Sequence, residues 1–238
     1  MGQKQEKNLI TYAYDKIKNK ILNKEILPGA KLNQQDLAKE LGISRTPIVK
    51  ALLKLETEGL VDNISNQGFY VHRLTLKELY DLFLLRQALD SLIISDIINK
   101  IEQEVIENLR GIFKPFIGCE WNAINVQLYR KADKIFHISL LHLCENDLVK
   151  KINNYFQIYE RTFHAGLVRE PRITLEEHLA IINALENHDE EAALSIICEH
   201  TEKSRQTLKE TIVRMKKLGY DISKMEVIDV SEIINKIK

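Results

Sequence analysis

The segment QDLAKELGISRTPIVKAL, residues 35–52, decides the fold of the N-terminal part of this chain. Ala38 supplies the small side chain that two helices need where they cross steeply, and Gly42 supplies the positive φ that turns the backbone between them. Ile48 falls where it can pack back on Leu37, and Pro47 falls in the first helical turn, where its missing N–H costs nothing. This spacing predicts a helix-turn-helix, with helices over residues 33–41 and 45–58.

The start of the second helix has the side chains that a DNA-reading helix uses. Ser44 is a good N-cap, and Arg45 follows it at the end of the helix that would enter the major groove. We expect Arg45 to contact a guanine edge, while Ser44 and Thr46 hold phosphates. Lys50 and Lys54 lie one and two turns further along and suit the DNA backbone. The alternative is a three-helix protein-protein module with a solvated basic face.

Residues 60–72 predict a hairpin, which we call the wing. Two short apolar segments, residues 60–64 and 69–72, flank the polar turn of residues 65–68. Gly68 would let the backbone approach the minor groove or a phosphate, although an ordinary turn glycine explains it equally well. Ahead of the helix-turn-helix, residues 8–24 predict one more helix, closed by a Pro-Gly turn at residues 28–29.

The rest of the chain is predicted to be helical. Only four prolines and nine glycines interrupt the sequence, and apolar residues recur at spacings of three and four. About six helices are expected after the wing, over residues 75–99, 102–117, 122–144, 147–165, 174–187 and 189–217, with a short amphipathic run at 230–237. The fold class is therefore mainly α, with a winged helix-turn-helix domain (residues 1–74) followed by a helical bundle with a C-terminal extension (residues 75–238).

Composition limits the function classes. The chain is 45% hydrophobic and 29% charged, and no run approaches the roughly 18 apolar residues of a membrane span. No secretory signal is apparent, so we expect a cytoplasmic protein without a membrane partner. Residues 1–74 have 12 Lys and Arg against 8 Asp and Glu, whereas the remainder has 22 against 26. This asymmetry suits a basic nucleic-acid module on a non-binding body.

Three histidines and one aspartate of the second domain form a candidate metal site. Asp133 and His137 are four residues apart, which places both on one face of a helix. His178 and His200 lie in two later predicted helices. Three imidazoles and a carboxylate from three helices suit a borderline divalent metal such as zinc, nickel or manganese. The alternative is that each histidine is an ordinary core or surface residue.

The N-terminal part resembles the DNA-binding domain of the GntR family. The resemblance covers residues 8–73 and rests on ILPGAKLNQQDLAKELG (26–42), ISRTPIVKALLKLETEGLV (43–61) and NQGFYV (66–71). It implies DNA contacts at Arg45 and at Gly68. The family has a second arginine where this chain has Val49. Valine cannot hydrogen-bond to a phosphate or a base edge, so either Lys50 substitutes for that arginine or the operator differs from that of typical members.

Residues 75–214 resemble the FCD ligand-binding domain of the FadR subfamily of these regulators. The family pattern Asp-x-x-x-His, then Glu-His, then a late His matches Asp133 and His137, then Glu177 and His178, then His200. The resemblance implies a metal site that holds a small carboxylate effector.

Three polar side chains are candidates for the effector cavity. Arg86 matches a family arginine that is followed four residues later by an acid, here Asp90, although a structural salt bridge would also explain the pair. Arg130 and Asn146 are the further candidates, and Asn146 could instead cap the helix that follows it.

The hypothesis that unites these features is a ligand-responsive homodimer on a pseudo-palindromic operator, a repressor released by a small carboxylate bound at the metal. In one alternative the metal itself or a non-carboxylate ligand is the signal. In another the metal activates water in a hydrolase. The hydrolase lacks a clear general base, because we expect Glu177 to face away from the neighbouring ligand His178 on the helix, so no enzymatic activity is predicted.

Overall fold

The computed structural model describes residues 2–222, 225–227 and 229–237. The chain divides into two compact units, Met1–Leu74 with Asn154–Gln157, and Thr75–Asn153 with Ile158–Lys238. Within the described residues, no helix has the length and apolar character that crossing a membrane requires.

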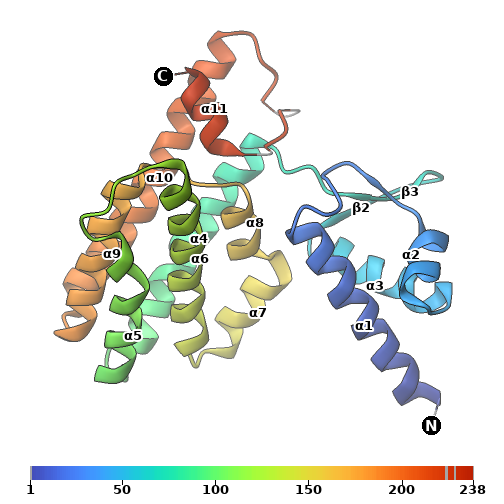
Figure 1. Cartoon of the computed structure of the whole chain (residues 1–238), viewed down its shortest axis with the longest axis horizontal. Coiled ribbons are helices and arrows are strands. Elements are labelled where there is room, and N and C mark those ends of the chain that lie inside the picture. The colour runs from blue at the N-terminus through green and yellow to red at the C-terminus, as the bar shows by residue number, and fades with distance from the viewer. Residues whose placement is uncertain (1, 223–224, 228, 238) are drawn as a thin grey trace. The chain divides into compact units, whose positions relative to one another are not determined.

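The first unit is the predicted winged helix-turn-helix (Figure 1). It consists of α1 (Gly2–Leu22), β1 (Lys31–Leu32), α2 (Gln34–Leu41), α3 (Arg45–Thr57), β2 (Val61–Ile64) and β3 (Gly68–Val71). The strands form an antiparallel sheet in the order β1-β3-β2, with Lys31 opposite Tyr70 and Asn63 opposite Phe69. The prediction omitted β1, because two residues are too few to show an alternating pattern.

The turn between α2 and α3 has the expected geometry. Gly42 has φ 66°, and its N–H bonds to the carbonyls of Ala38 and Lys39. The Asn33 side chain caps the start of α2 through the N–H groups of Gln35 and Asp36. Buried apolar residues of α1, α2, α3 and the sheet form one continuous core around this turn. The turn is therefore fixed by backbone geometry and by core packing together.

The second unit is all helical. Its elements are α4 (Leu76–Ile97), α5 (Gln103–Phe113), a 3₁₀ turn η1 (Lys114–Phe116), α6 (Ala123–Leu143), α7 (Asp147–Phe156), α8 (Ile158–His164), α9 (Pro171–Glu186), α10 (Glu190–Lys217) and α11 (Val230–Ile237). The single helix predicted over residues 147–165 is in fact two helices. Gln157 has φ 50°, and the Asn153 side chain accepts a hydrogen bond from the N–H of Tyr159 just beyond this break. A side chain that competes with the backbone in this way is not visible in apolar periodicity.

Helix α4 runs through the bundle and packs against α10, α8 and α6, while α9 packs against α10 and α5 (Figure 1). A capping box at Thr75 and Glu78 fixes the start of α4. The interior is not purely apolar, because α4, α6, α9 and α10 also bury several polar side chains: Arg86, Asp90, Asp133, His137, His178 and His200. Buried charges need partners, and these residues define the interior site.

Candidate functional site

The exposed N-terminal end of α3 presents three of the predicted DNA-contacting residues. Arg45 is the first residue of the helix, and its Nη2 donates to the Gln34 side chain at 3.1 Å. Ser44 occupies the N-cap position, but its side chain makes no capping bond. Ser44, Arg45 and Thr46 are all exposed. These three side chains can therefore reach a ligand at the end of the helix without disturbing the core.

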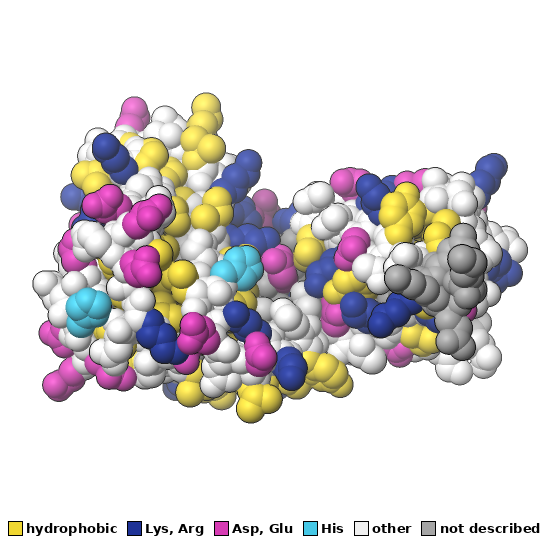
Figure 2. All heavy atoms as spheres, turned by 90° about the horizontal axis from the view of Figure 1, so that it is seen from below, with side chains coloured by type: hydrophobic (Ala, Val, Ile, Leu, Met, Phe, Trp, Pro, Cys, Tyr) yellow, Lys and Arg dark blue, Asp and Glu magenta, His cyan; other side chains and the backbone are white. Residues whose placement is uncertain are grey.

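The other predicted DNA contacts are already engaged within the unit. Lys50 Nζ pairs with Glu6 of α1 at 2.5 Å, and Lys54 Nζ lies 3.6 Å from the centre of the Tyr14 ring. Gly68 begins β3 with φ 100°, and a side chain there would meet only Lys31 Cε at 4.0 Å. The glycine is thus required by backbone conformation rather than by crowding. On the face shown in Figure 2, basic and acidic side chains are interspersed.

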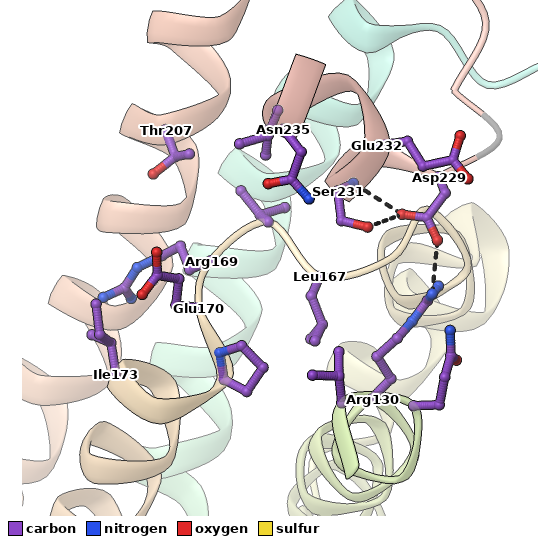
Figure 3. A pocket seen from close by; sticks show the side chains of 15 residues that line it. Arg130, Leu167, Arg169, Glu170, Ile173, Thr207, Asp229, Ser231, Glu232 and Asn235 are labelled. Atoms are coloured by element: carbon purple, nitrogen blue, oxygen red, sulfur yellow. Dashed lines mark hydrogen bonds and ion pairs between the residues drawn. The ribbon is translucent and has the colours of Figure 1, made fainter. Parts of the chain in front are cut away.

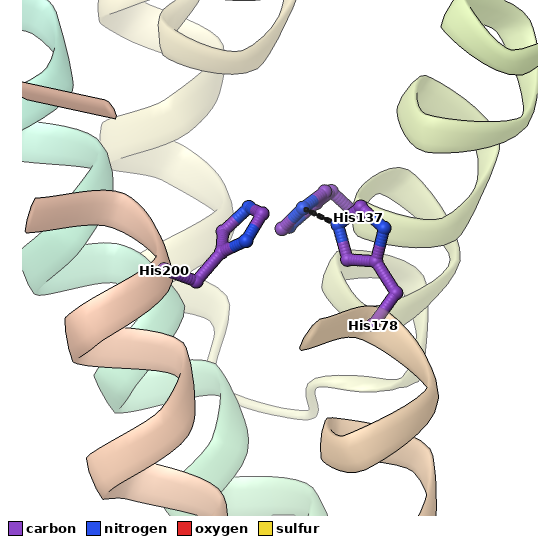
Figure 4. A group of neighbouring side chains, drawn as sticks. All are labelled: His137, His178 and His200. Atoms are coloured by element: carbon purple, nitrogen blue, oxygen red, sulfur yellow. Dashed lines mark hydrogen bonds between the residues drawn. The ribbon is translucent and has the colours of Figure 1, made fainter. Parts of the chain in front are cut away.

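The second unit brings three imidazoles together in its core. His137 comes from α6, His178 from α9 and His200 from α10, and one ring nitrogen of each lies within 4.8 Å of the others (Figure 4). His137 Nε2 and His178 Nε2 are 3.3 Å apart. His137 and His178 are fully buried and His200 is nearly so. Two facing nitrogens at this distance need a shared proton or a shared cation between them.

Asp133 adds an oxygen to this group. Its Oδ1 lies 3.2 Å from His178 Nε2 and 3.8 Å from His137 Nε2. Nitrogen and oxygen ligands of a tetrahedral zinc ion, at bond lengths of about 2.0–2.1 Å, lie about 3.3 Å from one another. The separations among Asp133, His137 and His178 are close to that value. The three histidines, which lie within 4.8 Å of one another, are therefore a candidate site for a divalent metal ion, with the Asp133 carboxylate next to His178 and His137.

A second polar group contacts the other nitrogen of each imidazole. His178 Nδ1 lies 3.0 Å from the Tyr129 hydroxyl, His200 Nδ1 lies 2.7 Å from Glu177 Oε2, and His137 Nδ1 lies 3.4 Å from Asp90 Oδ1. An acceptor at Nδ1 places the proton there and leaves the Nε2 lone pair for a metal. Glu177 therefore favours the metal-binding tautomer of His200, and the Tyr129 hydroxyl can do the same for His178, whereas His137 Nδ1 makes no hydrogen bond with a described residue.

The electrostatics favour neutral imidazoles. Burial, reinforced by the Arg86 guanidinium, lowers the pKa of His137 to about 4. Burial also lowers the pKa of His178 and His200, and raises the pKa of Asp133. Burial opposes ionisation of Glu177, but its hydrogen bonds with His200 and Arg169 outweigh this and lower its pKa. Near neutral pH the three histidines are therefore in the form that binds metals.

Two family descriptions match this chain. "Bacterial regulatory proteins, gntR family" matches residues 9–71, and "FCD domain" matches residues 81–203, which is more than half of the chain. The protein belongs to the GntR family and has an FCD domain.

Curated relatives support this assignment. The chain is 29% identical over 188 residues to the Nta operon transcriptional regulator of Aminobacter aminovorans, covering 78% of this chain and 87% of the relative. It is 21% identical over 201 residues to the HTH-type transcriptional repressor RspR of Escherichia coli, with 83% and 87% covered. This GntR-family protein is accordingly a DNA-binding transcriptional regulator and not an enzyme.

Solved structures support the fold. A GntR transcriptional regulator from Rhodococcus sp. RHA1 superposes with a TM-score of 0.66 at 18% identity, covering 84% of this chain and 97% of that one. At this identity the likeness extends to the architecture alone.

The predicted effector residues lie in three different places in the FCD domain. Arg86 is buried, pairs with Asp90 at 3.4 Å, and lines a small inner cavity of about 30 Å³ together with Asp133 and His200. Arg130 lies outside that cavity and pairs with Asp229. Asn146 is exposed, and its Oδ1 accepts hydrogen bonds from the first N–H groups of α7. Only Arg86 is therefore brought to the histidines, and Asn146 acts as a helix cap.

Sequence reasoning missed two partners of the candidate metal ligands in the FCD domain. Tyr129 was not singled out, although it lies four residues before Asp133 and so shares its helix face. Glu177 was expected to face away from its neighbour His178, and the prediction did not include the bond that it makes with His200 on α10. The expectation for Glu177 considered only its own helix, whereas its partner comes from another helix.

Proposed function

We propose that this GntR-family regulator is a homodimer that binds a pseudo-palindromic operator through α3 and the wing. Effector binding in the FCD domain releases it, so it acts as a repressor. The exposed end of α3 supports the DNA-reading role, with Arg45 on a base edge and Ser44 and Thr46 on phosphates. Lys50, Lys54 and the wing at Gly68 complete the contact with the DNA backbone.

The cluster of three buried histidines is the observation on which the proposed sensing role rests. Asp133, His137, His178 and His200 would hold a divalent ion, and the ion would supply a positive charge able to take a carboxylate oxygen. Arg86 lines the same inner cavity and offers a second cation to that carboxylate. Four protein ligands fill a tetrahedral shell, so direct ligation favours a metal that accepts more than four ligands, such as nickel or manganese.

The size of the inner cavity favours a second candidate. About 30 Å³ holds roughly two water molecules, which suits a carboxylate group but not the remainder of an organic acid. The alternative signal is therefore the metal itself. If metal loading alone changes operator affinity severalfold, the metal is the signal. If it does not, an organic effector is required, with a coupling of about 1–3 kcal/mol between the two sites.

The first experiment is the metal content of the purified protein by inductively coupled plasma mass spectrometry. We expect about one equivalent per chain in the wild type and loss of the metal in His200→Ala, because one of four ligands is removed. His142→Ala is the matched control, since His142 is an exposed histidine on α6 outside the cluster. A full equivalent retained in His200→Ala, or no uptake of zinc, nickel or manganese by the wild type, would refute the metal centre.

A further inference from the structure

A larger cavity, which we call the outer cavity, lies outside the candidate metal centre in the second unit. Its volume is about 550 Å³, within the usual range of small-molecule sites. Its walls come from the start of α6, the segment between α8 and α9, helix α10, and residues 229–235 of the C-terminal extension (Figure 3). Part of the outer cavity is thus built from residues beyond the segment that matches the FCD domain, 81–203.

The C-terminal extension is firmly placed against the bundle. Val230 and Ile234 of α11 are buried, as is Val227 ahead of it. The N–H of Val230 donates to the carbonyl of Ala165 at 2.7 Å. Burying these side chains removes apolar surface from water, so this wall of the cavity is a stable part of the fold.

The outer cavity combines an apolar wall with one incompletely used cation. Leu167, Pro171 and Ile173 supply apolar surface. Arg130 Nη1 bonds to Asp229 Oδ2 at 2.7 Å, and Arg130 makes no other hydrogen bond or ion pair with a described residue. Its remaining N–H groups have lost part of their water, because the side chain is only 20% exposed. Such donors favour an acceptor supplied by a ligand.

The other charged groups of the cavity are compensated or solvated. Arg169 is paired with Glu177 through two bonds of 2.7 Å. Glu170 and Glu232 are exposed, so solvent screens their charges.

Asp229 Oδ1 accepts from both the N–H and the hydroxyl of Ser231 at the start of α11. Asp229 therefore acts as an internal carboxylate on Arg130, and Arg130 is the cation available to an anion.

We propose that the outer cavity is a second small-molecule site, which takes an organic monocarboxylate with an apolar body, with Arg130 as the carboxylate anchor and Asp229 as an internal competitor. The site goes beyond the proposed function, because it needs no metal.

The outer cavity adjoins the candidate metal centre, since Leu167, Val168 and Arg169 line both the outer and the inner cavity. The Arg130–Asp229 pair lies directly over Gly166, where a Cβ would come within 2.6 Å of Asp229 Oδ1. A ligand at Arg130 therefore contacts the loop that also borders the histidines.

Isothermal titration calorimetry with octanoate, octanamide and octylamine tests this proposal, because the three probes share an apolar body and differ in head-group charge. Octanoate should bind the full-length protein at least tenfold more tightly than the other two. Arg130→Gln should weaken octanoate binding about tenfold or more, and Arg130→Lys should weaken it less, since a charge remains. The matched control Lys131→Gln removes an exposed cation from the neighbouring position and should leave binding unchanged.

Asp229→Asn separates a binding role from a structural one. Removing the internal carboxylate should tighten octanoate binding severalfold, whereas a purely structural pair would give weaker binding. Wild-type affinity in Arg130→Gln, equal binding of octanamide, or no octanoate binding at millimolar concentration would overturn the proposal.

The same titration in the metal-site variant His137→Ala/His178→Ala distinguishes this site from the metal centre. Retained octanoate affinity is the expected result and leaves the metal proposal to be judged by metal content alone. Loss of octanoate binding in that variant, with full affinity in Arg130→Gln, would place the carboxylate at the metal and overturn the outer site. Chelator-stripped wild-type protein serves the same purpose if the double variant does not fold.

Discussion

Replacing Glu177 by Gln should weaken metal binding without removing any metal ligand. Glu177 Oε2 lies 2.7 Å from His200 Nδ1, and its carboxylate makes two further bonds of 2.7 Å with Arg169. Glutamine keeps the shape and one acceptor but loses the charge that makes His200 a stronger base. Partners of this kind are worth about 10- to 100-fold in metal affinity. At about 1.4 kcal/mol for each factor of ten, the expected cost is about 1.4–2.8 kcal/mol.

Competition for zinc against a chromophoric chelator at neutral pH measures this cost as a change in Kd. Glu176→Gln is the matched control, because Glu176 is the neighbouring acid on α9 and is exposed. Its Kd should equal that of the wild type. The thermal midpoint of the metal-free proteins should be recorded in parallel, since Arg169 loses its partner in Glu177→Gln.

One result would refute the reasoning. If Glu177→Gln binds zinc with the wild-type Kd while His200→Ala does not bind it, then Glu177 has no part in orienting or polarising His200. The bond at Nδ1 would then be only a structural contact. An equal loss of affinity in Glu176→Gln would mean that the general negative charge near α9 matters, rather than this hydrogen bond.

Three changes in the winged unit have separate expected outcomes. Arg45→Ala should lower operator affinity by about 1–3 kcal/mol in fluorescence anisotropy at physiological salt. The thermal midpoint should stay unchanged, because the side chain is exposed. Unchanged operator affinity would contradict the base contact. Val49→Arg should steepen the salt dependence of DNA binding by about one phosphate contact, and an unaltered slope would contradict that placement. Gly42→Ala should destabilise the fold by roughly 1–2 kcal/mol in urea unfolding, because alanine disfavours the left-handed backbone that φ 66° requires. No atom lies within 4 Å of the new Cβ, so a steric clash adds nothing to this cost. Gly111→Ala, at a helical glycine of α5, should instead stabilise it.

Local signals allowed most of the fold to be predicted. The helix-turn-helix depends on contacts only a few residues apart, such as the bonds from Gly42 back to Ala38 and Lys39. The features that were missed depend on partners from distant segments or on side-chain competition with the backbone. Strand β1 exists because Lys31 pairs with Tyr70, and the break at Gln157 is accompanied by a side-chain bond from Asn153 to Tyr159. Neither feature changes the apolar periodicity.

The candidate site likewise has parts that follow from the sequence and parts that depend on contacts between distant helices. Asp133 and His137 share a helix face, so their proximity follows from the sequence, but the approach of His178 and His200 could be inferred only from a family resemblance. The groups at the outer nitrogens were harder still. Tyr129 continues the Asp133–His137 face and could have been found by extending the spacing by one turn. Glu177 could not, because its partner His200 lies on another helix and the choice of rotamer decides the contact.

The C-terminal extension shows most clearly what lies beyond a single sequence. Its amphipathic helix was predicted over residues 230–237, and the structure has α11 over the same residues. Asp229 and Arg130 are 99 residues apart and match no motif, yet they form a 2.7 Å pair on the wall of the larger cavity. Amphipathicity indicates that a helix will be buried on one face but not against which surface. A contact that could regulate ligand access is therefore specified by the docking of this extension, and only a three-dimensional structure can identify it.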